Sequence, residues 1–156
     1  MAVMEMTMSV VALAALAAMV PSSQSQAAEP PRVISLTQLP CQFLESEGVD
    51  RGYKSAKKAD CDAINGKTGA DRLAKSKVIE SKPGKHVFRV KNESVPYELG
   101  FWLRGEGLKG RATLPSVSGG GLTRGKTQDY EIELRPGNYL YSCPLNTTPD
   151  YKLTVK

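Results

Sequence analysis

Apolar and polar residues alternate with a period of two along most of the C-terminal half of the chain. Residues 77–92 (KVIESKPGKHVFRVKN) and residues 127–143 (TQDYEIELRPGNYLYSC) each have the pattern of a strand, a Pro-Gly turn and a second strand. Their apolar positions are filled by β-branched and aromatic residues, which suit the pleated surface of a half-buried sheet. With residues 32–39 near the start and residues 151–155 at the end, the pattern predicts at least six strands in an all-β, antiparallel β-sandwich.

Two segments interrupt this strand pattern. Residues 41–76 are polar, rich in Gly, Asp and Lys, and contain two cysteines. A structureless loop of that length is uncommon in a compact domain, so this insert is expected to hold a short helix over residues 60–75 or to be pinned covalently. Residues 105–125 (GEGLKGRATLPSVSGGGLTRG) are expected to form a mobile loop because of their many glycines.

The chain has three cysteines, Cys41, Cys61 and Cys143. In an oxidising compartment two of them pair and the third thiol requires an explanation. A Cys41–Cys61 bond would close a loop of about 20 residues, worth on the order of 3 kcal/mol in the chain-entropy model. We favour this pairing because it explains how the long polar insert stays ordered. The alternative joins Cys41 to Cys143 across one end of the sandwich and leaves Cys61 on the insert.

The N-terminal segment has the features of a signal peptide. Residues 8–20 form an apolar run that is followed by small and polar residues, and cleavage is expected after Ala27 or Ala28. The run is shorter than the roughly 20 residues that a membrane-spanning helix needs. We therefore expect residues 1–28 to be removed and residues 29–156 to form a single domain that is periplasmic or secreted.

The charge balance is basic but does not indicate a nucleic-acid partner. The formal net charge is +5, and it rises by one, to +6, when the leader and its only charged residue, Glu5, are removed. The Lys and Arg residues are scattered and do not form a stripe with aromatic residues between them. Binding of nucleic acid is therefore not expected.

Four features occur in order along residues 32–156: Cys41 after the first strand, Asn92 at the end of a segment with a Gly turn, Glu98 after the aromatic Tyr97, and Pro136-Gly137-Asn138-Tyr139 leading to Cys143. Together these features resemble the cupredoxin superfamily. Within it they resemble most the cupredoxin-like domain of the EfeO-type periplasmic iron-uptake proteins, which has the same four features. The resemblance implies a cupredoxin-like Greek-key sandwich and the binding of copper or, with less support, iron.

The ligands of a blue-copper site are mostly absent. Such a site uses two His, one Cys and a weak axial Met. This chain has a single His, His86, and no Met after Met19. Tyr97-Glu98 occupies the place where the first ligand His is expected, and residues 144–150, which follow the cysteine, contain neither His nor Met. The ligand count excludes a type 1 electron-transfer site.

Topology nevertheless brings candidate ligands to one end of the sandwich. If each Pro-Gly turn reverses the chain at one end, residues 92–98 and residues 143–150 emerge at the other, where Cys41 also lies. Cys143, Glu98 and Cys41 are therefore the predicted metal ligands, with Asn146 and Asp150 nearby. Thiolates select copper(I) or zinc, and a carboxylate suits a harder ion such as iron(III) or copper(II).

Each predicted ligand also has an ordinary structural explanation. Cys143 can be a buried free cysteine, since cysteine is among the residue types most often found inside proteins. Glu98 can be a surface carboxylate paired with Arg104 or Lys91. His86 lies six residues before Asn92 in an extended strand, about 20 Å from the cluster, so it is expected to be structural or exposed.

The leading hypothesis is an exported metal-binding protein, a copper or iron carrier or accessory whose partner is a periplasmic or membrane-bound uptake or redox protein. The alternative is a metal-free interaction module that uses residues 99–105 (LGFWLRG) and residues 116–122 (SVSGGGL) as its contact surface. Thiol redox chemistry is a third hypothesis, weakened by the absence of a Cys-x-x-Cys motif. Enzymatic activity is not expected, because the single His lies far from Cys143 and the two cannot form a nucleophile and base pair.

Overall fold

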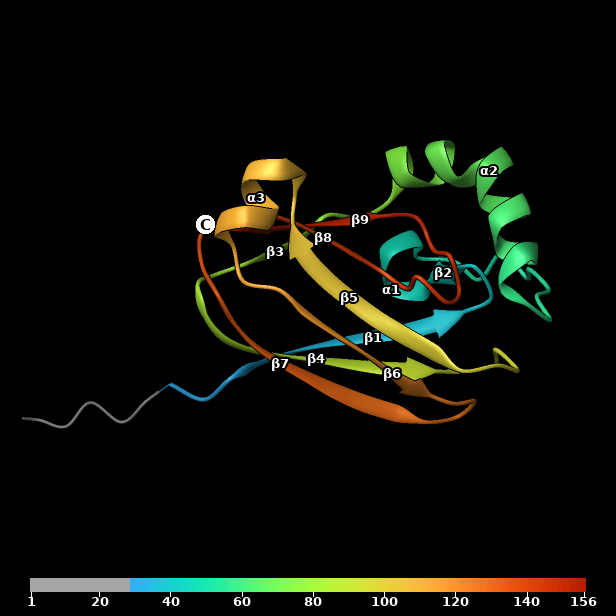
Figure 1. Cartoon of the computed structure of the whole chain (residues 1–156), viewed down its shortest axis with the longest axis horizontal. Coiled ribbons are helices and arrows are strands. Elements are labelled where there is room, and N and C mark those ends of the chain that lie inside the picture. Colours follow the sequence, from blue (N-terminus) through green and yellow to red (C-terminus); the bar gives the residue numbers. More distant parts are fainter. Residues whose placement is uncertain (1–28) are drawn as a thin grey trace, which may run out of the picture.

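The computed structural model describes residues 29–156, so the predicted leader lies outside the described residues. Two sheets pack face to face as a sandwich, with strand orders β2-β1-β4-β7 and β3-β9-β8-β5-β6 (Figure 1). The first sheet consists of β1 (Arg32–Leu39), β2 (Gln42–Phe43), β4 (Gly84–Asn92) and β7 (Thr127–Leu134). The second consists of β3 (Ile79–Ser81), β5 (Leu99–Gly105), β6 (Val117–Leu122), β8 (Gly137–Ser142) and β9 (Tyr151–Val155). The helices are α1 (Leu44–Glu47), α2 (Lys58–Lys75) and α3 (Gly107–Thr113).

The predicted all-β sandwich is confirmed, but its strands are not all antiparallel. β1 runs parallel to β4, with Gln38 opposite Asn92, and β3 runs parallel to β9. Both sheets are therefore mixed. The two parallel pairs join segments that are far apart in the sequence, and the local alternation of apolar residues does not reveal them.

The two Pro-Gly turns connect the sheets and do not form hairpins. β3 and β4 flank Pro83-Gly84 but lie in different sheets, and the same holds for β7 and β8 around Pro136-Gly137. The φ angles of Gly84 and Gly137 are +118° and +152°, values that side chains with a Cβ rarely adopt. The turns therefore occur where the sequence predicts them, and each passes the chain across the sandwich.

Aromatic side chains fill the space between the sheets. Phe43 meets the rings of Phe101, Tyr141 and Tyr151 edge-on, with centroid distances of 6.3, 5.6 and 5.9 Å. All four residues are almost fully buried, and Cys143 belongs to the same apolar cluster. Such large buried rings contribute much of the favourable free energy of folding.

Helix α2 confirms the helix predicted in the insert and extends it by two residues at its start. Asp60 stabilises its start by reaching back, since its carboxylate accepts the backbone N–H groups of Ala56 and of Lys57, the residue before the helix. A buried ion pair of 2.7 Å between Arg72 of α2 and Glu47 of α1 anchors the helix to the sandwich. Within residues 29–156, no helix combines the length and the apolar character needed to cross a membrane.

The second interrupting segment, residues 105–125, is ordered, contrary to the expectation of a mobile loop. It contains α3 and β6, and β6 pairs with β5. A Cβ atom added to Gly105 would lie 2.2 Å from the carbonyl oxygen of Gly110, so α3 packs backbone to backbone against the end of β5. These two glycines mark a close contact, which is a common reason for glycine inside regular structure.

Candidate functional site

Three chain segments meet at one end of the sandwich, as the sequence predicts. The parallel register of Gln38 with Asn92 places the ends of β1 and β4 together. The segment after β8 joins them there, because Asn146 donates from its side chain to the carbonyl oxygen of Leu39 at 2.8 Å. Figure 1 shows α2 at this end of the sandwich and α3 at the other end.

Helix α2 covers the segment that follows β8. Asn65 of α2 donates to the carbonyl oxygen of Thr147. A Cβ added to Gly69 would lie 4.0 Å from the ring of Pro149, an ordinary van der Waals contact. The insert therefore closes the end of the sandwich where the predicted ligands lie.

A disulfide between Cys41 and Cys61 fixes α2 in this place. The two Cα atoms lie 5.0 Å apart, and the pairing is the one that the sequence favours. The predicted role of Cys41 as a metal ligand conflicts with this bond, because a sulfur atom in a disulfide has no thiolate to offer. Cys41 also has a φ angle of +64°, an uncommon conformation for a residue other than glycine.

Cys143 is the free cysteine of the described residues, and its side chain has no exposed surface. Its Sγ atom accepts the backbone N–H of Asn146 at 3.2 Å and that of Gly100 at 3.4 Å. Burial raises the pKa of the Cys143 thiol, although these hydrogen bonds act in the opposite direction. The side chain is therefore a neutral thiol at physiological pH.

Gln38 completes the surroundings of this thiol. It is fully buried, and its Nε2 atom donates to the carbonyl oxygen of Gly100 at 2.8 Å. Its Oε1 atom is buried and has no donor among residues 29–156. Gly100 joins this amide to Cys143, because its carbonyl oxygen accepts from Gln38 while its N–H donates to the Cys143 sulfur.

Asn146 joins the thiol to the disulfide, a role that the sequence does not reveal. Its Oδ1 atom accepts the backbone N–H of Cys41 at 3.0 Å and lies 3.3 Å from the Sγ atom of Cys61. Its Nδ2 atom donates to the Leu39 carbonyl oxygen, so this buried side chain joins the segment after β8 to the end of β1 and to α2. The only sequence signal is its position three residues after Cys143.

The predicted ligand Glu98 does not reach this cluster. Its side chain is exposed, and its Oε1 atom accepts the backbone N–H of Gly121 at 2.8 Å. Across residues 29–156 there is no group of three or more His, Cys, Asp and Glu side chains that could hold a metal ion. Cys143, Glu98 and Cys41 therefore lie at the same end of the sandwich without forming a common site.

The remaining candidates have structural contacts. The Tyr97 hydroxyl lies 2.6 Å from the Ser55 hydroxyl, and burial raises the pKa of Tyr97, so the phenol stays neutral. Asp150 pairs with the buried Arg104 at 2.6 Å. His86 is buried beside the first Pro-Gly turn, where its ring nitrogens lie 2.7 Å from Ser81 Oγ and 2.8 Å from the Gly84 oxygen. The expectation that His86 is structural agrees with these contacts.

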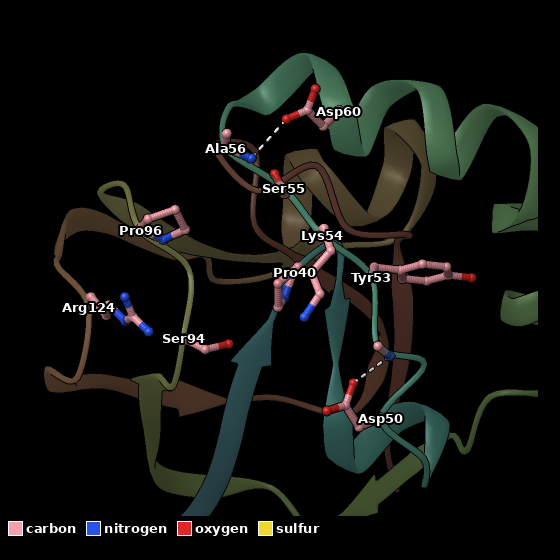
Figure 2. Close-up of a pocket in the computed structure, with 11 residues that line it drawn as sticks. Pro40, Asp50, Tyr53, Lys54, Ser55, Ala56, Asp60, Ser94, Pro96 and Arg124 are labelled. Carbon is pink, nitrogen blue, oxygen red and sulfur yellow. Dashed lines mark hydrogen bonds between the residues drawn. The ribbon is translucent and has the colours of Figure 1, made fainter.

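An open pocket lies beside the disulfide-linked insert, with a volume of about 480 Å³. Figure 2 shows its wall formed by three loops: residues 50–56 of the insert, residues 94–96 after β4, and the turn that carries Arg124. Its charged lining residues are Asp50, Lys54, Asp60 and Arg124. No local sequence pattern predicts this pocket, because it depends on how distant loops meet.

Comparison with solved structures assigns the fold. Over 83% of this chain and 93% of the other, the structure matches auracyanin B with a TM-score of 0.51 at 12% sequence identity. The fold is cupredoxin-like. Auracyanin A, a "blue" copper protein from Chloroflexus aurantiacus, matches over 81% of this chain and 100% of the other at 15% identity, with a TM-score of 0.40. Lac15, from a marine microbial metagenome, matches over 87% of this chain and 29% of the other at 14% identity, with a TM-score of 0.40. No protein-family model and no curated protein matches the sequence.

The residues around Cys143 do not fit a type 1 copper ion. The groups that act on its sulfur atom are the backbone N–H groups of Gly100 and Asn146 and the side-chain amide of Gln38. The only imidazole of the chain is at His86, where it is occupied by Ser81 and Gly84. Type 1 copper requires two imidazoles beside the thiolate, so the surroundings of Cys143 do not form a type 1 site.

Proposed function

We propose that this protein is an exported, non-enzymatic cupredoxin-like binding module that works without a type 1 copper centre. The observation that carries this proposal is the enclosure of Cys143. Its sulfur accepts two backbone N–H groups, its side chain is fully buried, and the disulfide-linked helix α2 covers the segment that follows it. A thiol enclosed in this way contributes to packing. We therefore assign ligand recognition to the surface that the insert, residues 41–76, adds beside the thiol.

Export is supported by the cysteine chemistry and by the leader. Disulfides persist in oxidising compartments and are rare in the cytosol of most organisms. The Cys41–Cys61 bond and the apolar run of residues 8–20 therefore favour the same location. The periplasm or the extracellular medium is the proposed compartment.

A metal carrier is the second candidate function. The observation that favours it is the buried Oε1 atom of Gln38, which has no donor among the described residues and whose amide is linked to the Cys143 thiol through Gly100. A copper(I) ion would take Cys143 as its thiolate ligand, and its chemistry would be that of a soft monovalent cation held for delivery. Iron is less well supported, since Glu98, the carboxylate ligand it would prefer, lies apart from the thiol.

Copper titration of the exported protein separates the two candidates. The full chain is expressed with its leader, recovered from the exported fraction, and titrated with copper(I) against a competing chelator, with native mass spectrometry as the second readout. The binding-module proposal predicts no blue colour with copper(II) and the same copper(I) affinity in the wild type and in Cys143→Ser. A bound copper(I) ion whose affinity falls by roughly tenfold or more in a folded Cys143→Ser variant would establish the carrier instead.

A further inference from the structure

We propose that the pocket beside the insert binds a small molecule bearing carboxylate groups. This inference rests on the proposed function as a binding module and names its class of ligand. The pocket is separate from the Cys143 thiol, and its chemistry comes from residues on three loops that the cupredoxin-like sandwich brings together (Figure 2).

The pocket is pre-formed, because buried polar side chains hold each of its three loops. Gln42 is fully buried and clamps the insert loop by donating to the carbonyl oxygen of Val49 at 2.8 Å and accepting the N–H of Arg51 at 3.1 Å. Ser55 is pinned through its hydroxyl to Lys57 and Tyr97. The wall contributed by the insert is therefore fixed before any ligand arrives.

Asn92 holds the other two loops. Its side chain accepts the N–H of Val95 at 2.9 Å and donates to the carbonyl oxygen of Leu122 at 3.1 Å. Its backbone N–H donates to the carbonyl oxygen of Lys126 at 3.0 Å, and its own carbonyl oxygen accepts the N–H of Gly125 at 2.7 Å. These two residues follow Arg124, so Asn92 also holds the turn that carries Arg124. A site whose loops are already fixed loses little conformational entropy on binding, which favours affinity.

The charged side chains left free in this pocket are cationic. Figure 2 shows Lys54 entering from the insert, Arg124 from the opposite side, and Ser94 between them. Within residues 29–156, these three side chains form no hydrogen bond or ion pair. In contrast, Asp50 and Asp60 already accept backbone N–H groups, from Gly52 at 2.7 Å and from Ala56 at 2.8 Å.

The free groups select the class of ligand. An ammonium and a planar guanidinium facing each other suit an anion with more than one oxygen, and the guanidinium can bind a carboxylate through two parallel hydrogen bonds. Pro40 and Pro96 add apolar wall that can contact a carbon skeleton. The volume of about 480 Å³ lies in the usual range for small-molecule sites, so a small organic acid fits better than a bare inorganic ion.

The test is calorimetric titration of the exported protein at low ionic strength with citrate and succinate, and with inorganic phosphate as the second oxyanion. Two double variants each remove two positive charges. Lys54→Ala/Arg124→Ala changes the pocket, and Lys82→Ala/Lys109→Ala changes exposed lysines outside it. All four residues are exposed, so both variants are expected to fold, and circular dichroism checks this.

We expect saturable binding of an organic acid that weakens by roughly tenfold or more in the pocket variant and by less than about twofold in the matched control. Equal weakening in both variants would mean that the binding depends only on the overall surface charge, and this would overturn the proposal. Absence of binding by citrate and succinate, or stronger binding of phosphate, would also overturn it. None of these outcomes depends on copper, so failure here leaves the copper titration, and with it the proposed function, to be judged separately.

Discussion

The backbone N–H of Asn146 donates to the Sγ atom of Cys143 over 3.2 Å, while its side-chain oxygen lies 3.3 Å from the Sγ atom of Cys61. One asparagine thus separates the free thiol from the disulfide. The same side chain holds the backbone of Cys41 and of Leu39. The order of this end of the sandwich therefore depends on Asn146 as well as on the covalent bond.

Replacing Asn146 with alanine is expected to destabilise the protein by about 2 to 4 kcal/mol. The change would leave the buried N–H of Cys41 and the carbonyl oxygen of Leu39 without their partners, at 3.0 and 2.8 Å in the wild type. Chemical denaturation followed by tryptophan fluorescence measures the loss in the free energy of unfolding. A decrease below about 0.5 kcal/mol, the size of an ordinary surface substitution, would show that other groups or water replace these hydrogen bonds.

The Cys41–Cys61 disulfide is expected to control access to the Cys143 thiol. Cys143 has no exposed surface, and the bond holds α2 over the segment that follows it. In Cys41→Ser/Cys61→Ser the insert loses its tether, and reaction of Cys143 with a thiol reagent under native conditions should accelerate by roughly tenfold or more. Rates are measured by mass spectrometry, which also identifies the labelled cysteine.

Two controls accompany the labelling experiment. Cys143→Ser should show no labelling. The wild type and Cys41→Ser/Cys61→Ser should label Cys143 at the same rate in strong denaturant, where shielding is lost. Equal rates under native conditions would mean that the sheets alone, and not the tethered helix, shield the thiol.

The sequence predicts the strands and turns well because each depends on neighbouring residues. The apolar alternation around Phe88 and Tyr130 and the two Pro-Gly turns all correspond to observed elements. The sheet to which each strand belongs is not local information. A Pro-Gly turn looks the same in the sequence whether it closes a hairpin or crosses between sheets, as Gly84 and Gly137 do here.

The sequence predicts where the candidate site lies, but not which side chains meet there. Topology correctly brings Cys41, Asn92 and Cys143 to one end, because strand direction and turn position determine it. The direction of a side chain such as Glu98, which turns toward Gly121, depends on the irregular segment before β5. The sequence also leaves the cysteine pairing open, because three cysteines allow three pairings and distance in the sequence does not choose among them.

Gly105→Ala is expected to destabilise the protein by about 1 to 3 kcal/mol, because the new methyl group would overlap the backbone of α3. The added Cβ would lie 2.2 Å from the Gly110 oxygen, so the helix must move. Gly66→Ala is the matched control, in the exposed middle of α2 with nothing within 4 Å of the added carbon. It should stabilise by about 0.5 to 1 kcal/mol, since alanine favours helix more than glycine does. Thermal unfolding of both variants checks the pair, and the same sign in both would contradict the argument.

The buried ion pair between Glu47 and Arg72 is expected to make stability depend on acid pH. Burial alone would raise the pKa of Glu47, but hydrogen bonds from Arg72, Tyr151 and Arg51 together hold it below the ordinary value of 4.5. A carboxylate with a lowered pKa stabilises the folded state above the pKa of the unfolded chain. The stabilisation from Glu47 begins to decrease as the pH falls below about 4.5, and it is lost as the pH falls through the pKa of Glu47 in the folded state.

Glu47→Gln should therefore lower the free energy of unfolding at neutral pH by about 3 to 5 kcal/mol, because Arg72 is left as a buried charge without its partner. Below pH 4.5 the difference from the wild type should shrink, since the wild-type carboxyl then becomes protonated and equally neutral. Denaturant unfolding at a series of pH values measures this, with Glu131→Gln on the exposed face of β7 as the control. A difference between Glu47→Gln and the wild type that stays constant from neutral to strongly acid pH would show that packing, and not the charge of Glu47, holds α2 in place.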